Sequence, residues 1–353
     1  MRATDNSVKF GRPYYERVIS ENGYDPGLFE GFAEDMPQVP REDLERIFLC
    51  HSGLYEFRDS PQAKGVLTGF GLSGVPHLGT LSQINRIGLL NRSGYHAEVI
   101  LGDLDAYNGK LTPIAETHEL ASTYANFIQS TELLDPENST VRNQFDNPAV
   151  LRTAYLIGRF LTDGMFVNAE EDLHDLYVSQ GKVDSDMTYR RKLSLNLMLA
   201  DFFHLGQTHP EVLVMLGLDE HQYVQTGQAV AEKIDEQSSG LKPVRISSLY
   251  TPLIRGFNGF PKMSKSFPGS GITLDMPTSA VEKLIMDERD DHETPEDSVV
   301  YQVACGIGLG AETTLGEAYQ AAQEKRGEWY DIKKLVVARI ASFGRLWQEA
   351  VQQ

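Results

Sequence analysis

The feature that most constrains the fold is a strand, a glycine-rich turn, a helix and a second strand in direct succession. The apolar pair at 66–67 leads into TGFGLSGVPHLGT at 68–80, and residues 80–92 then repeat apolar side chains at helical spacing. A second apolar run, AEVILGDLDAY at 97–107, follows at once. Two strands joined by one helical crossover run parallel. The sequence therefore predicts an α/β fold built on a Rossmann-like parallel sheet.

The glycines of residues 68–80 have two interpretations. Glycine allows a buried strand to turn sharply into a helix, which is a structural role. The backbone N–H groups and the positive dipole end at a helix start also attract phosphate, which is a functional role. This stretch alone favours the structural role, and a second phosphate-binding segment elsewhere in the chain would favour the functional one.

The rest of the chain is expected to combine helices with buried strands. Residues 46–57 mix aromatic and β-forming side chains around Ser52 and Gly53, which predicts a hairpin. Residues 112–205 are mainly helical in pattern, and 211–222 form a buried strand. Apolar residues between 332 and 347 predict a C-terminal amphipathic helix.

Composition narrows the class of protein. The chain has 41% hydrophobic and 23% charged residues, which is ordinary for a globular protein. Its N-terminus lacks the apolar core of a signal peptide, no apolar run approaches the ~20 residues of a membrane span, and only two cysteines occur. We therefore expect a cytoplasmic protein with no membrane partner and no metal site of its own. The net charge of −18 argues against nonspecific binding of nucleic acid.

A second segment changes the interpretation of the glycine-rich turn. PKMSKSFPGSG at 261–271 places Lys262, Ser264, Lys265 and Ser266 between two prolines. A lysine–serine loop on its own is most often a solvated surface loop. KMSKS, however, paired with HLGT at 77–80 in a strand–helix–strand context, resembles the two signatures of class I aminoacyl-tRNA synthetases.

The resemblance covers about residues 46–285 and is greatest to the tryptophanyl side of the tryptophanyl/tyrosyl branch. LMLAD at 197–201 resembles the Leu-Met-Ala-Ala-Asp of bacterial tryptophanyl enzymes, in which the aspartate accepts the indole N–H. GLDEHQYV at 217–224 resembles the segment that contacts ribose and amino acid. RIFLCHSGLYEFRD, from 46, resembles the β-hairpin element of archaeal and eukaryotic tryptophanyl enzymes.

The resemblance implies a reaction and a set of partners. The carboxylate of an amino acid, most simply tryptophan, attacks the α-phosphorus of ATP, pyrophosphate leaves, and the aminoacyl group passes from the adenylate to tRNA. Mg²⁺ arrives on the ATP phosphates rather than in a protein cage. Enzymes of this branch act as homodimers. Arg152, Arg159, Arg190, Arg191 and Lys192 lie in or beside the helical insertion, where acceptor-stem contact is expected.

The resemblance also assigns roles to residues. It implies catalytic roles for His77, Lys262 and Lys265. The residues that would bind ATP are Gly69, Gly71, His77, Gly79, Thr80, Gly217, Asp219, Lys262, Met263, Ser264, Lys265 and Ser266. The residues that would bind the amino acid are Leu67, Met198, Asp201 and Glu220. Asp103 and Asp105 are expected to polarise a ligand or cap the turn that follows them, with acid–base catalysis as the alternative.

Three parts are expected along the chain. They are an N-terminal extension with the hairpin at 1–62, a Rossmann-like catalytic domain at 63–274, which includes a helical insertion at about 112–190, and a short helical C-terminal domain at 275–353.

Three departures from the family pattern keep other functions open. Glu220 stands where the family has glutamine, Leu67 stands where archaeal and eukaryotic enzymes have tyrosine, and the part after Lys265 is short and acidic. One alternative is a paralogue that activates an amino acid for a biosynthetic acceptor other than tRNA. Another is a non-catalytic regulatory homologue, against which the intact His77, Lys262 and Lys265 argue.

Overall fold

The computed structural model describes most of the chain. The described residues are 10–27, 30–169, 174, 178, 181, 186–264, 269–289, 292–310 and 313–353. Lys265 and Ser266, two of the predicted ATP-binding residues, lie outside them.

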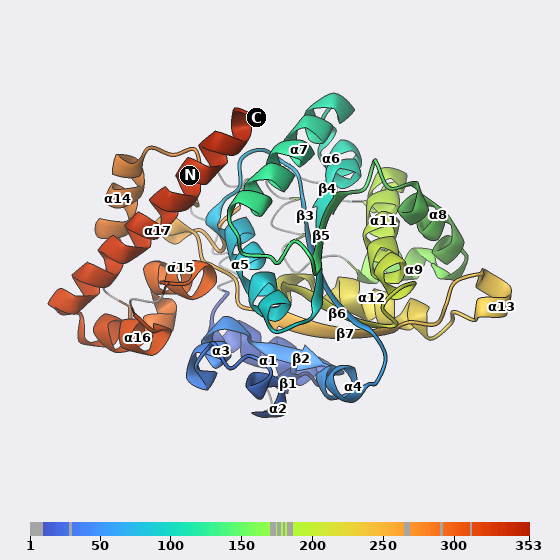
Figure 1. Cartoon of the computed structure of the whole chain (residues 1–353), viewed down its shortest axis with the longest axis horizontal. Helices are drawn as coiled ribbons and strands as arrows, with labels where there is room; N and C mark the ends of the chain where they lie inside the picture. Colours follow the sequence, from blue (N-terminus) through green and yellow to red (C-terminus); the bar gives the residue numbers. More distant parts are fainter. Residues whose placement is uncertain are drawn as a thin grey trace.

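A single seven-stranded sheet organises the described chain (Figure 1). Its strands are β1 (Asp25–Pro26), β2 (Cys50–Ser52), β3 (Lys64–Gly71), β4 (His96–Gly102), β5 (Ser139–Asn143), β6 (Glu211–Gly217) and β7 (Arg245–Thr251). The spatial order is β1-β2-β7-β6-β3-β4-β5. The five strands β3 to β7 pair in parallel, and β2 and β1 add to the β7 edge in antiparallel fashion. The predicted Rossmann-like parallel sheet is confirmed.

The predicted strand–helix–strand unit is present as β3, α5 (Leu78–Arg92) and β4. The second strand ends earlier than predicted, at Gly102, because α6 (Asp103–Lys110) starts at the first of the two aspartates. Asp103 is fully buried, and its carboxylate accepts the backbone N–H groups of Leu104, Gln144 and Phe145. Asp103 therefore ties the start of α6 to the segment that follows β5.

The predicted hairpin at 46–57 is wrong. This segment instead contains the end of α3 (Arg41–Ile47), the short strand β2, and most of α4 (Leu54–Asp59). Gly53 takes a left-handed conformation with φ of 71°, from which the chain enters α4 instead of returning as a second strand. The partners of β2 come from β1 and from the distant β7, where Cys50 lies opposite Tyr250. Local β-propensity could not reveal these partners.

Helices cover both faces of the sheet. The N-terminal helices are α1 (Arg12–Asn22) and α2 (Glu30–Glu34). The predicted helical insertion holds α7 (Ile114–Ser130), α8 (Pro148–Ile157), α9 (Asp163–Asn168) and the start of α11 (Tyr189–Gly206). After β6 come α12 (His221–Ala231) and α13 (Glu236–Ser239). The C-terminal part has α14 (Thr278–Met286), α15 (Val299–Ile307), α16 (Leu315–Glu324) and α17 (Gly327–Val351). The insertion also contributes β5 to the main sheet, a strand that the helical pattern concealed, and the domain limits stay a prediction.

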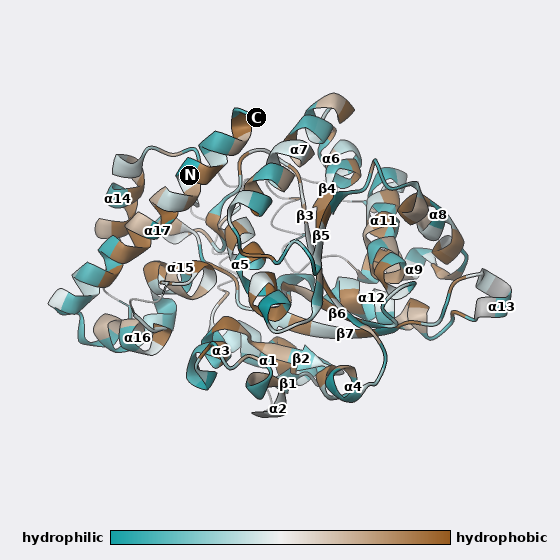
Figure 2. Cartoon of the chain, in the orientation of Figure 1, coloured by the Kyte–Doolittle hydropathy of each residue, from teal (hydrophilic) through white to brown (hydrophobic). Residues whose placement is uncertain are grey.

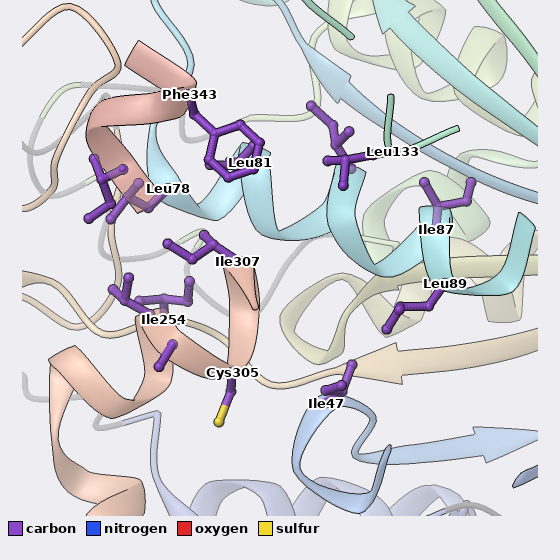
Figure 3. Packing of buried hydrophobic residues seen from close by; sticks show 14 of the residues in the cluster. Ile47, Leu78, Leu81, Ile87, Leu89, Leu133, Ile254, Cys305, Ile307 and Phe343 are labelled. Carbon is purple, nitrogen blue, oxygen red and sulfur yellow. The ribbon is translucent and has the colours of Figure 1, made fainter. Parts of the chain in front are cut away.

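The core consists of two apolar clusters, one on each face of the sheet. Successive strand residues alternate between them, since Val66 packs in one cluster and Leu67 in the other. The first cluster joins α5, α15 and α17, as Leu81, Ile307 and Phe343 show (Figure 3). The second lies under α8, α11 and α12. In Figure 2 apolar and polar residues alternate along α17, as expected of a helix with one buried face.

The strand order places the site. The chain moves from β3 outward to β4 and β5, and then returns to the other side of β3 with β6 and β7. Ligands of open α/β sheets bind at such a reversal, beyond the carboxyl ends of the strands. Gly71 and Gly217 end the two strands concerned, β3 and β6. No helix in the described ranges has the length and apolar character needed to cross a membrane.

Candidate active site

A cleft of about 450 Å³ opens at the carboxyl ends of β3, β4 and β6. It is lined by fourteen of the residues predicted to act on substrates: Leu67, Gly69, Gly71, His77, Gly79, Thr80, Met198, Asp201, Gly217, Asp219, Glu220, Lys262, Met263 and Ser264. These are all the predicted site residues within the described chain, so the fold brings together segments that are nearly two hundred residues apart. Their individual roles stay predictions.

The HLGT segment forms the start of α5. His77 is the N-cap residue, and its Nδ1 accepts the backbone N–H of Thr80 at 3.3 Å. Its imidazole lies against Gly79, where a Cβ atom would be 2.7 Å from His77 Cε1, so a side chain at position 79 would displace the imidazole. The backbone of Leu78 donates to Ile272 O at 3.1 Å, which ties the helix start to the segment after the KMSKS loop. The imidazole is therefore fixed at a helix N-terminus, where an anion is favoured.

Lys262, the first residue of KMSKS, contacts the GLDEHQYV segment that follows β6. Its Nζ lies 2.6 Å from Oδ2 of Asp219, which is buried beyond the end of β6. Met263, the next residue, is also buried and donates its N–H to Ile254 O at 2.9 Å. The first signature lysine thus already lies over the residue predicted to bind ribose.

A buried arginine that the motif analysis missed lines the same end of the cleft. Arg86, on α5, is 1% exposed, and its Nη1 makes only long contacts, 3.5 Å to Ser82 Oγ and 3.3 Å to Pro252 O. No partner is described for its Nε. Burial lowers the pKa of Arg86 to about 10, so it stays charged at neutral pH. A basic residue inside the apolar stripe of 80–92 was the available sequence signal.

The opposite end of the cleft holds Asp201 in a hydrogen-bonded network. Its Oδ1 accepts from Arg142 Nη1 at 2.8 Å and its Oδ2 from Gln144 Nε2 at 2.8 Å. Arg142 Nε also donates to Glu98. Burial raises the pKa of Asp201 to about 6, and the attraction of Arg142 offsets this only in part. Asp201 is thus paired with an arginine and still lines the cleft.

Apolar side chains flank this end. Leu67, Ile100 and Met198 line it from β3, β4 and α11. Asp105 lines it as well, and burial raises the pKa of its carboxyl group. The two aspartates of GDLDAY therefore differ. The carboxylate of Asp103 accepts hydrogen bonds from backbone N–H groups, whereas Asp105 faces the cleft.

The five basic residues expected to contact a tRNA acceptor stem do not lie together in one place. Arg190 and Arg191 line the cleft, whereas Arg152 and Arg159 are exposed on or just after α8. Lys192 Nζ pairs with Asp163 Oδ1 at 2.7 Å. Within the described ranges no group of three or more metal-ligating side chains comes together.

Comparisons with known proteins identify the family of the chain. The model of the family of class I tRNA synthetases (W and Y) matches residues 61–303. A tryptophan–tRNA ligase of Aeropyrum pernix is 26% identical over 289 residues, which is 76% of this chain and 71% of the relative.

Solved structures share the fold over most of the chain. The tryptophanyl-tRNA synthetase of A. pernix superposes with a TM-score of 0.75 at 18% identity, over 96% of this chain and 93% of the other. A tryptophan-bound tryptophanyl-tRNA synthetase of Encephalitozoon cuniculi superposes with a TM-score of 0.71 at 14% identity, over 96% of each chain. The tyrosyl-tRNA synthetase of A. pernix superposes with a TM-score of 0.62 at 17% identity, over 88% of this chain and 90% of the other. This chain belongs to the class I tRNA synthetases of the tryptophan and tyrosine type.

Proposed function

We propose that this chain is a tryptophan–tRNA ligase, which activates tryptophan with ATP and transfers it to tRNA. One observation carries the proposal. HLGT and the described residues 262–264 of KMSKS line one end of a cleft whose other end combines apolar walls with the buried hydrogen-bond acceptor Asp201. An indole needs both an apolar cavity and one acceptor for its N–H.

ATP would lie at the His77 end of the cleft. The helix start at Leu78, with His77 and Gly79, offers donors and positive potential to the phosphates. Lys262 would leave Asp219 for the developing pyrophosphate, which frees that carboxylate to accept hydrogen bonds from ribose hydroxyls. Lys265 and Ser266, outside the described residues, are assigned to the same phosphates by the signature. Mg²⁺ bound to these phosphates would supply further charge stabilisation.

Tryptophan would lie between Leu67 and Met198 with its indole N–H toward Asp201. Its carboxylate is already a nucleophile at neutral pH, so catalysis rests on positioning and on charge stabilisation at the phosphates. The acidic Asp105 faces the same end and suits the α-ammonium group.

The acceptor and the assembly complete the proposal. Arg190 and Arg191 line the cleft wall and would contact the phosphates of a tRNA acceptor end. α8 and α11 pack together and expose Leu151, Tyr155, Tyr189 and Leu193, a surface that suits a second copy of the chain in a homodimer. Both cysteines are buried free thiols, which accords with a cytoplasmic location.

ATP–pyrophosphate exchange with each of the twenty amino acids tests the proposal. Exchange should be strongest with tryptophan, and total tRNA should then be charged with it. Binding of tRNA should weaken as salt rises, because phosphate contacts release counterions. Exchange without any charging, together with no tRNA binding at low salt, would favour a biosynthetic paralogue. No exchange with any amino acid would contradict an activating enzyme altogether.

Arg86 yields a separate prediction about ATP. Arg86→Met keeps an unbranched side chain but removes a buried cation for which no carboxylate partner is described. The free energy of unfolding of the ligand-free protein should rise by about 1 kcal/mol or more, since a buried charge is costly. ATP affinity should fall, because the cation at the phosphate end is lost. Urea unfolding and ATP titration measure the two effects.

Arg92→Met is the matched control. Arg92 lies on the same helix, but its Nη1 donates to Leu133 O at 2.7 Å, away from the cleft. It should leave ATP affinity unchanged. A destabilised Arg86→Met protein with normal ATP affinity would show that Arg86 serves only the fold.

A further inference from the structure

Three charged side chains from three elements meet beneath the amino-acid end of the cleft. Glu98 comes from β4, Arg142 from β5 and Asp201 from α11. Their side chains are 7%, 11% and 2% exposed, so the network is largely shielded from water. Arg142 contacts both carboxylates, and it does not line the cleft itself. Two acids share one cation in a place where charge is weakly screened.

The network is organised around Asp201, the member that faces the cleft. Arg142 donates a hydrogen bond to one oxygen of the Asp201 carboxylate and Gln144 donates to the other. Each oxygen keeps a second lone pair that can accept a further hydrogen bond. Gln144 is held in turn by two hydrogen bonds. Its side-chain Oε1 accepts the backbone N–H of Asp105, and its backbone N–H donates to Asp103 Oδ1. The carboxylate is therefore fixed in orientation and can still accept one more hydrogen bond.

We propose that Arg142 and Glu98, acting in opposite senses through Asp201, set how strongly the cleft binds an amino acid whose side chain donates a hydrogen bond. This inference rests on the proposed function, in which Asp201 accepts the indole N–H. Arg142 is a positioning residue: it stabilises the carboxylate form of Asp201 and orients it. Glu98 competes for the same guanidinium and repels the Asp201 charge.

The electrostatics of the network support these opposite senses. Burial is the largest influence on Asp201 and raises its pKa to about 6, Arg142 lowers it, and Glu98 raises it. Burial opposes the charged form of Arg142, but Asp201 and Glu98 outweigh it and raise its pKa. The other groups nearby are Asp103 and Asp105 on α6, and His204 one turn further along α11. Burial and Arg142 lower the pKa of His204.

The sign of the pH dependence follows from these shifts. Asp201 is ionised above about pH 6 and accepts a charge-assisted hydrogen bond there. Below that pH it is protonated, and a neutral acceptor makes a weaker bond. Tryptophan affinity should therefore fall by about tenfold as the pH is lowered through the Asp201 transition. Phenylalanine has no side-chain donor, so its weak binding reports only the pH dependence that both amino acids share through Asp105 and the α-ammonium group, and the Asp201 transition is the part seen with tryptophan alone.

Tryptophan binding without ATP, measured by equilibrium dialysis between pH 5 and 8.5, tests the proposal. Leaving ATP out excludes the titration of His77 against phosphate. Glu98→Gln should move the midpoint of the transition to lower pH by about one unit, and Arg142→Met should move it to higher pH by at least as much. Arg142→Lys, which keeps the charge but loses the two-pronged geometry, should lie between Arg142→Met and the unmodified protein.

Glu211 and Arg245 provide matched controls on the same sheet. Glu211 is buried at the start of β6, at the end of the sheet opposite the cleft, with Arg245 Nε 3.7 Å from its Oε2. Glu211→Gln and Arg245→Met should leave the midpoint unchanged. Arg142→Met leaves two buried acids facing each other and can fail to fold for that reason. In that case the midpoints of Glu98→Gln and of the double variant Glu98→Gln/Arg142→Met test the proposal instead.

The outcomes separate the inference from the function. Midpoints that move in opposite directions for the Glu98 and Arg142 variants support the proposal, since a purely structural role would not produce them. If the variants still bind tryptophan and their midpoints equal that of the unmodified protein, the proposal is overturned. A protein that neither binds nor activates tryptophan would instead overturn the proposed function.

Discussion

Replacing Lys262 by alanine should lower the rate of ATP–pyrophosphate exchange far more than it weakens tryptophan binding. A contact to charge that develops in the transition state contributes about 2–4 kcal/mol, which corresponds to about 30- to 1000-fold in rate. Of the two lysines in KMSKS, Lys262 is the one that lies within the described residues. Its Nζ is 2.6 Å from Asp219 Oδ2, at the end of the cleft that we propose for ATP. Steady-state exchange kinetics, with tryptophan binding measured separately, distinguish the two effects.

Lys334→Ala is the control for this experiment. Lys334 is an exposed lysine on α17 that pairs with Asp331 at 3.4 Å, so its loss should leave exchange unchanged. The double replacement of Lys262 and Lys265 should reduce exchange further. Exchange at the rate of the unmodified protein in that double variant would reject the assignment of the loop to the phosphates.

Replacing Asp201 by alanine should remove the preference for tryptophan over phenylalanine and spare ATP binding. A site built to hydrogen-bond a substrate group rejects an analogue without that group by about 10⁴–10⁵-fold, and most of this discrimination should be lost. The reason is that the only difference Asp201 detects between the two side chains is the donor. Exchange kinetics with both amino acids, at saturating ATP, measure the ratio of kcat/KM values.

Two further measurements sharpen this prediction. Asp201→Asn keeps the shape of the side chain and leaves Arg142 a neutral acceptor, so it tests discrimination if the alanine variant is unstable. Tyrosine also carries a donor, and its rate relative to tryptophan shows whether the Leu67 and Met198 walls select the larger ring. Unchanged discrimination in a folded Asp201 variant would mean that specificity arises elsewhere in the cleft.

The end of the cleft that we propose for ATP could be located from the sequence because it is built from local patterns. HLGT begins a helix after a strand, and the glycines and His77 lie within a few residues of one another. KMSKS is likewise contiguous. The alternation of Val66 and Leu67 between the two cores also follows from the two-residue period of a strand.

The amino-acid end depended on tertiary structure. LMLAD indicated Asp201, but nothing local connects it with Arg142, 59 residues away, or connects Arg142 with Glu98, 44 residues away. Arg142 belongs to β5, a strand hidden in a segment of helical character. A buried charge is identified by its partners, and these became neighbours only when β4, β5 and α11 packed together.

The N-terminal edge of the sheet shows the same division. Residues 46–57 have the β-forming side chains of a hairpin, but β2 pairs with β1 and with β7, about two hundred residues further on. By itself the sequence indicated which segments bury an apolar face and which short motifs to assign to phosphate, because both depend on residues a few positions apart. Only the tertiary structure decided which strands pair and which buried charges share a counter-ion, because those energies belong to contacts between segments far apart in the chain.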